Sequence, residues 1–197
     1  ILEAELIKLY SNANRYINFA IANQLYTICH LNNLNFKRVR NIMQDGYARN
    51  LNLANAGFTA GPCLVKDTMQ LKYFTRNSFS LGSAAMKVNE NIPNLIIDKL
   101  KMFKNYKSKK IGLLGLSFKG ETDDIRDSLS IVLLKKLKKL NLKILQSDEY
   151  YKAKNGISKK ELIKRSDIII IGAPHKAYKK LKINKKKKKI IDIWDII

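Results

Sequence analysis

The segment AGPCLVKD at residues 60–67 brings a cysteine, a lysine and an aspartate close together on the chain. A cysteine reacts as its thiolate, which nearby cations and helix N-termini favour. Cys63 sits on a Gly-Pro turn, has Lys66 nearby, and precedes a helix that we expect to begin near Asp67 or Thr68. A thiolate can add to an aldehyde to give a thiohemiacetal, which becomes a thioester when a hydride is removed, and water then releases an acid. Cys63 is therefore a candidate nucleophile.

Such chemistry needs a cation or amide at the oxyanion, a group that handles the proton, and a carboxylate that activates water. Asp67 is the candidate carboxylate. Lys8 and Asn12 are four residues apart, so they share one face of a predicted helix and could meet the oxygen together. A lone cysteine on a turn is more often structural, and at this point both interpretations stay open.

Helical patterns dominate the chain up to residue 106. Residues 4–34 carry apolar side chains at helical spacing with no Pro or Gly, which is typical of a domain's central helix or of a dimer interface. A short helix closed by Gly46 follows. Further helices are expected after Cys63, and Pro93 interrupts or opens one of them.

The pattern changes near Lys107. Short apolar runs typical of buried strands follow at 110–118, 142–148, 167–174 and 188–194. Helical stretches separate the first three runs, and strand–helix–strand alternation predicts a parallel sheet covered by helices. The fold class is therefore α/β: an all-helical domain (1–106) followed by a Rossmann-like domain (107–197).

Cap signals mark the two helices of this second domain. Asp127 or Ser128 is the predicted N-cap of the first helix. Ser158 and Glu161 form a capping box that opens the second helix.

The glycines after the first strand, Gly112, Gly115 and Gly120, lack the G-x-G-x-x-G spacing of a dinucleotide-binding turn. The domain is thus expected to be Rossmann-like without holding NAD in the usual way. A ligand should still lie beyond the carboxyl ends of the strands. The residues there are Phe118, Lys119, Asp124 and Arg126.

The net charge of +22 raises the possibility of a nucleic-acid or membrane-surface partner. The lysines are spread along the whole chain, however, and the run at 185–189 is typical of a solvated loop. No apolar run approaches the roughly 20 residues that cross a bilayer. We expect neither nucleic acid nor membrane as the partner, although a basic nucleic-acid-binding module and a dimerisation scaffold without catalysis remain alternatives.

The cysteines and histidines suggest neither a disulfide framework nor a metal site. Two distant cysteines favour a reducing cytoplasm, and Cys29 is expected in the core of its helix. His30 and His175 are far apart, and no ligand spacing supports them, so we assign no metal. His175 follows a strand end and is a further ligand candidate by position alone.

Three motifs then coincide in order: AELIKLYSN (4–12), AGPCLVKD (60–67) and GLLGLSFKGETDDIRDS (112–128). Together they resemble the UDP-glucose/GDP-mannose dehydrogenase family of nucleotide-sugar dehydrogenases. The resemblance covers nearly the whole chain except the Lys-rich end. It implies a helical central domain with the catalytic residues and dimer contacts, and a Rossmann-like domain for the nucleotide sugar. The family's N-terminal NAD-binding domain has no counterpart here, so we expect a fragment of a longer protein.

The resemblance also implies catalytic roles for individual residues. Cys63 stands at the nucleophile and Asp67 at the carboxylate that assists hydrolysis. Lys8 and Asn12 match the pair that contacts the oxygen of the reacting carbon and its water. Many members have Gly-Gly before the cysteine segment where this chain has Ala60-Gly61, so the turn should survive unless Ala60 needs a positive φ.

Binding roles follow in the same way. Phe118 and Lys119 match the substrate-contacting Phe-Lys pair, and Arg49 matches an arginine that reaches a neighbouring subunit's substrate. Lys66 falls on the NAD side of the site, and Arg126 matches an arginine that reaches NAD.

The implied reaction is a four-electron oxidation in which two NAD molecules act in turn. It takes the primary alcohol of a UDP-sugar to the carboxylate through the Cys63 adduct. The chain alone is expected to be inactive because it lacks the NAD domain. The resemblance implies a homodimer or higher homo-oligomer and does not name the sugar.

Overall fold

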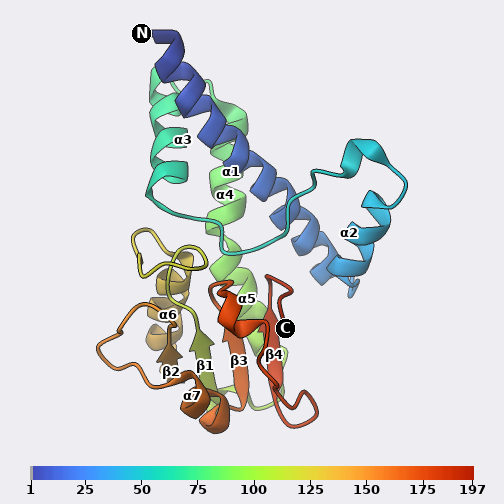
Figure 1. The fold of residues 1–197 in the computed structure, drawn as a ribbon, viewed down its shortest axis with the longest axis vertical. Coiled ribbons are helices and arrows are strands. Elements are labelled where there is room, and N and C mark those ends of the chain that lie inside the picture. Colours follow the sequence, from blue (N-terminus) through green and yellow to red (C-terminus); the bar gives the residue numbers. More distant parts are fainter. Residues whose placement is uncertain (1) are drawn as a thin grey trace. The chain divides into compact units, whose positions relative to one another are not determined.

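The computed structural model describes residues 2–197, and Ile1 lies outside the described residues. The chain divides into two compact units, one ending at Asn91 and the other covering Ile92–Ile197. The first unit is helical, and the second contains a parallel sheet with helices (Figure 1). This arrangement confirms the predicted fold class.

The helical unit is built around one long helix, α1, on which α3 and α4 both pack (Figure 1). Its helices are α1 (Leu2–Leu31), α2 (Phe36–Gln44), α3 (Pro62–Phe74) and α4 (Ser80–Glu90), with a 3₁₀ turn, η1, at Ala48–Asn50. Tyr16, Ile17 and Ala20 of α1 form a core cluster with Leu64 of α3 and Ala85 of α4. The predicted long helix is thus the element that positions α3.

Helix α3 begins earlier than the sequence analysis expected, so the predicted start near Asp67 or Thr68 is wrong. Its first residue is Pro62, whose fixed φ suits the first helical position and whose missing N–H costs nothing there. Gly61 precedes it with φ of 112°, a conformation that strongly favours glycine. Cys63 is therefore inside the first turn. Ala60 is not among the residues with positive φ, so the Ala-Gly pair meets the conformational requirement.

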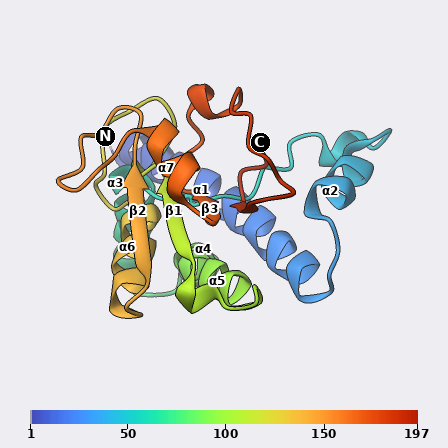
Figure 2. The same cartoon turned by 90° about the horizontal axis from the view of Figure 1, so that it is seen from below.

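The second unit contains a four-stranded parallel sheet in the order β2-β1-β3-β4. The strands are β1 (Lys110–Leu114), β2 (Lys143–Ser147), β3 (Ile168–Ile171) and β4 (Lys189–Asp192), each within a predicted apolar run. The helices are α5 (Ile92–Lys101), α6 (Leu129–Lys139) and α7 (Lys159–Arg165), with 3₁₀ turns η2 (Tyr106–Ser108) and η3 (Lys176–Tyr178). Figure 2 shows α5 and α6 on one face of the sheet and α7 on the other.

The helix starts of this unit agree with the cap signals. Ser128 is the N-cap of α6, and its side chain accepts a hydrogen bond from the N–H of Ser130. Ser158 caps α7 by accepting from the N–H of Glu161. The Glu161 side chain pairs with Arg165, so of the two hydrogen bonds of the capping box the structure describes the one accepted by Ser158.

The division between the units lies before α5, whereas the sequence analysis placed it near Lys107. Helix α5 buries Leu95, Ile96 and Leu100 and packs on α6 and β4. Its apolar face therefore belongs to the core of the sheet unit. Among the helices described between Leu2 and Ile197, none combines the length and the apolar character needed to cross a membrane.

Candidate functional site

Two of the predicted catalytic residues are in direct contact. The side-chain amide of Asn12 on α1 donates a hydrogen bond of 2.6 Å to Oδ2 of Asp67 on α3. Asp67 is only 1% exposed, and its Oδ1 has no hydrogen-bond partner in the described structure. The Lys66 ammonium lies 3.9 Å from Oδ1. The carboxylate is thus held by Asn12 through one oxygen, while the other oxygen is buried without a described hydrogen-bond donor.

Cys63 and Lys8 each lie one helical turn from this contact. Cys63 is four residues before Asp67, so the two share a face of α3, and its thiol is free and exposed. Lys8 is four residues before Asn12 on α1 and is also exposed. Since Cys63 occupies the first turn of α3, it lies among backbone N–H groups that have no intrahelical acceptor. An accessible thiol beside a buried carboxylate is an arrangement that supports nucleophilic addition followed by hydrolysis.

Phe118 and Lys119 lie in the loop that follows β1, at the carboxyl edge of the sheet. Phe118 is half-buried, Lys119 is exposed, and the Lys119 ammonium lies 5.5 Å from the centroid of the Phe118 ring. A cation held over an aromatic face suits an anionic, partly apolar ligand such as a nucleotide.

Arg126 lies further along the same loop and is paired with Asp124. Its Nε and Nη2 donate to both carboxylate oxygens of Asp124, with the shortest contact at 2.7 Å. The Arg126 side-chain hydrogen bonds are the main cause that holds the pKa of Asp124 below its usual range. Asp124 therefore orients Arg126. This anchored and exposed guanidinium fits a diphosphate.

Lys66 and Arg49 are the remaining predicted site residues. The Lys66 side chain is 68% exposed, and its one described ion pair is the contact with Asp67. Arg49 lies on η1 and is exposed. Its predicted role at a neighbouring subunit's substrate stays a prediction.

The turn after β1 does not form the usual cradle for a dinucleotide. Gly115 has φ of 97°, and a Cβ on it would lie 2.4 Å from the backbone nitrogen of Ala173. The turn therefore packs against the segment that follows β3, where a pyrophosphate would have to approach in the usual fingerprint.

Asp148 is a residue whose importance the sequence analysis missed. It follows β2, the position from which a Rossmann fold usually contacts a ribose. Its side chain is fully buried, and its oxygens accept backbone hydrogen bonds from Leu116, Ser117, Tyr150 and Tyr151. This acidic residue is thus engaged inside the protein, and its position after an apolar run was the available signal.

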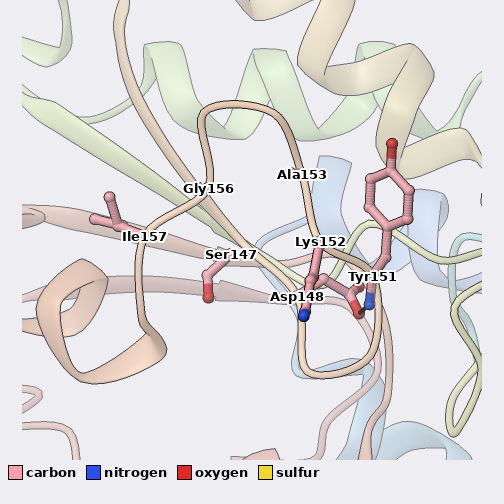
Figure 3. Close-up of a pocket in the computed structure, with 7 residues that line it drawn as sticks. All are labelled: Ser147, Asp148, Tyr151, Lys152, Ala153, Gly156 and Ile157. Carbon is pink, nitrogen blue, oxygen red and sulfur yellow. Dashed lines mark hydrogen bonds between the residues drawn. The ribbon is translucent and has the colours of Figure 1, made fainter.

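A small cavity of about 200 Å³ lies beside Asp148, between the end of β2 and the loop that returns to Ile157 (Figure 3). Figure 3 shows Lys152 and Tyr151 on the loop that closes it. The cavity is smaller than the ~300–1,000 Å³ of most ligand pockets. It is too small for a nucleotide sugar.

His175, a ligand candidate by position, is completely buried. Its ring contacts Ser117, Glu121 and Asp148, which come from the ends of other elements. It therefore contributes to the internal structure of the carboxyl edge and does not present a free ring to a ligand.

Comparison with known proteins agrees with this arrangement. Residues 2–91 match the central domain of the UDP-glucose/GDP-mannose dehydrogenase family, and residues 112–197 match the family's UDP binding domain. A UDP-glucose 6-dehydrogenase of Bacillus subtilis is 33% identical over 153 residues, which are 75% of this chain and 35% of the relative. A UDP-N-acetyl-D-mannosamine dehydrogenase of Campylobacter jejuni is 31% identical over 135 residues, 68% of this chain and 33% of the relative.

Solved structures show the same fold. A UDP-D-ManNAc dehydrogenase from Pyrococcus horikoshii superposes with a TM-score of 0.84 at 26% identity, covering 99% of this chain and 49% of that protein. The chain thus spans about half of that structure and about a third of the two relatives above. The two family domains follow one another along the chain in the positions of the helical and sheet units. The chain belongs to the UDP-glucose/GDP-mannose dehydrogenase family.

Proposed function

We propose that the full protein oxidises the primary alcohol of a nucleotide sugar, of the UDP-glucose type, to the uronic acid with two molecules of NAD. The observation that carries this proposal is the hydrogen bond between Asn12 and the buried Asp67, one helical turn from the exposed Cys63. Nucleophilic catalysis with a hydrolytic second step needs a thiol and a carboxylate in such proximity.

Cys63 acts at the aldehyde stage. Its thiolate forms a C–S bond to the aldehyde carbon, and the carbonyl oxygen becomes the oxyanion of a thiohemiacetal. The Lys8 ammonium and the Asn12 amide stabilise this oxygen. When bound, NAD would supply the hydride acceptor for both oxidations, and Lys66 and Arg126 would hold it.

Asp67 acts in the hydrolysis of the resulting thioester. Its free Oδ1 takes a proton from water, and the water oxygen attacks the thioester carbon. The C–S bond then breaks, which returns the Cys63 thiolate and releases the carboxylic acid, and the acid loses its remaining proton to solvent. Asn12 keeps Asp67 in the orientation that this proton transfer needs.

Binding depends on an aromatic ring and several positively charged side chains. Phe118 and Lys119 contact the nucleotide sugar, Arg49 contacts the substrate of a neighbouring subunit, and Lys66 and Arg126 contact NAD. The positive charges of these lysines and arginines suit the nucleotide sugar and NAD, because each of these ligands carries a diphosphate. The proposal includes a homo-oligomer and, because it needs a reduced thiol, a cytoplasmic location.

The test uses the two cysteines of the chain as a matched pair in the full protein. With NAD and UDP-glucose, UDP-N-acetylglucosamine, UDP-N-acetylmannosamine or GDP-mannose, Cys63→Ala should abolish formation of the acid, whereas Cys29→Ala should retain it. Mass spectrometry of the product measures the acid. In an Asp67→Asn variant, the thioester on Cys63 should accumulate as a covalent mass increase on the peptide that contains it. Acid production by Cys63→Ala at the wild-type rate would refute the proposal.

A further inference from the structure

The loop at residues 116–121, which we call the Lys119 loop, is joined to the ends of β2 and β3 by a largely buried hydrogen-bond network. We propose that Asp148, His175 and Glu121 are positioning residues that hold this loop in one conformation, so that Lys119 meets the substrate phosphates without prior rearrangement. The inference rests on the proposed contact between Lys119 and the nucleotide sugar.

Asp148 fixes the first part of the loop. Its Oδ2 accepts the backbone N–H groups of Leu116 at 2.5 Å and Ser117 at 3.2 Å. Its Oδ1 accepts those of Tyr150 and Tyr151 at 2.9 and 3.0 Å. One buried carboxylate thus connects the residues after β1 to those after β2. A buried N–H group without an acceptor raises the free energy of the folded state, so these hydrogen bonds restrict the loop to this position.

His175 links the same carboxylate to the far end of the loop. The backbone N–H of Glu121 donates to Nδ1 of His175 at 2.9 Å, so Nδ1 carries no proton and Nε2 does. The hydroxyl of Ser117 donates to the carbonyl of Lys119, so its oxygen can accept from His175. The Nε2–H is therefore shared between Ser117 Oγ at 3.2 Å and Asp148 Oδ2 at 3.3 Å. Only the neutral ring with its proton on Nε2 satisfies all of these contacts.

Glu121 completes the network on the outer side. It accepts the N–H of Lys176 at 2.8 Å and the hydroxyl of Tyr150 at 2.9 Å. Its backbone has φ of 58°, which is uncommon for a residue with a side chain and persists only where surrounding contacts enforce it. The Lys176 N–H is the main cause that lowers the pKa of Glu121, in agreement with an ionised side chain at this place.

Phe118 and Lys119 lie between these two attachments. The Phe118 N–H donates to the carbonyl of Asp124, and the Lys119 carbonyl accepts from Ser117. A Cβ on Gly120 would lie 2.7 Å from the carbonyl oxygen of Pro174, so the loop packs closely on the segment after β3. The backbone of the loop is thus ordered before a ligand arrives, which reduces the conformational entropy lost on binding.

The test measures the dissociation constant of UDP by titration calorimetry on the full chain. Glu121→Ala removes two hydrogen bonds that hold the loop and should weaken UDP binding about 10-fold. Glu121→Gln keeps an acceptor for the Lys176 N–H and should bind within about 3-fold of the wild type. Glu149→Ala is the matched control, since Glu149 lies on the β2 side of the network and pairs with Lys159.

A second set of variants shows whether the effect acts through Lys119. In a Lys119→Ala background, Glu121→Ala should change the dissociation constant less than about 2-fold, because coupled residues are non-additive. The same 10-fold loss in both backgrounds, or wild-type affinity of Glu121→Ala, would overturn the inference. If Lys119→Ala alone leaves UDP binding unchanged, the proposed substrate contact fails.

Hydrogen exchange of the backbone amides at 118–120 gives a readout that does not depend on UDP. Exchange there should be faster in Glu121→Ala and unchanged in Glu149→Ala. Equal exchange in the wild type and Glu121→Ala would show that the network does not order the loop and would overturn the inference.

Discussion

The buried amide pair Asn23–Asn89 supports the helical unit, and its removal should lower stability strongly. The Asn23 amide donates to Oδ1 of Asn89 at 2.8 Å, and the Asn89 amide donates to the carbonyl of Tyr16 at 3.0 Å. Oδ1 of Asn23 accepts the N–H of Gly57 at 2.9 Å, which fastens the segment that leads to Cys63. Both asparagines are completely buried.

Asn89→Ala removes the hydrogen bonds that Asn89 makes with Asn23 and with the carbonyl of Tyr16. The buried amide of Asn23 then loses Oδ1 of Asn89 as its acceptor. An unsatisfied buried donor costs roughly 1–3 kcal/mol, and the second lost bond adds about 1 kcal/mol. We therefore expect the free energy of unfolding to fall by about 2–4 kcal/mol. Asn18→Ala, an exposed position on the same helix α1, should stay within about 0.5 kcal/mol of the wild type.

Urea unfolding followed by two probes measures this effect. Circular dichroism at 222 nm follows mainly the helical unit, and the fluorescence of Trp194, the single tryptophan, follows the sheet unit. The Asn89→Ala shift should be largest in the circular dichroism transition. The double variant Asn23→Ala/Asn89→Ala should lose less than the sum of the single losses, since the two side chains share a bond. A loss below about 0.5 kcal/mol for Asn89→Ala would refute the reasoning.

Three further predictions concern acid stability, turnover and the salt dependence of ligand binding. Burial raises the pKa of Asp148, but the hydrogen bonds from His175 and the backbone amides outweigh this effect and hold the pKa below its usual range. The ionised Asp148 side chain therefore stabilises the fold above about pH 4, and this stabilisation is lost as the pH falls further. The difference in unfolding free energy between the wild type and Asp148→Asn should accordingly shrink between pH 5 and pH 2, and a constant difference would contradict this. The 197-residue chain alone should reduce no NAD with any UDP-sugar, measured by absorbance at 340 nm, and measurable turnover would contradict that expectation. Its preference for a UDP-sugar over free phosphate should persist as salt rises, whereas binding to a nucleic-acid backbone would weaken steeply.

The sequence determined most of the fold, because local patterns carried the information. The four apolar runs became β1–β4, since a strand buried on both faces needs continuous apolar residues. The cap at Ser128 followed from side chains that bond to their own backbone neighbours. The predicted start of α3 is too late because a Gly-Pro pair is typical of a turn, whereas here Gly61 is the N-cap and Pro62 is the first residue of the helix.

For the candidate site, the sequence alone identified the residue types and predicted Lys8 and Asn12 as a pair on one helix, through a spacing of four residues. Cys63 and Asp67 share a face of one helix only because α3 begins at Pro62, earlier than predicted. The contact between Asn12 and Asp67 needed the packing of α1 against α3, which joins residues far apart in the chain. The same holds for Asp148, Glu121 and His175, which lie on separate connections and meet only because parallel strands end at one edge of the sheet. Spacing along the chain predicts neighbours within one helix, whereas hydrogen bonds between distant segments are decided by how the elements pack.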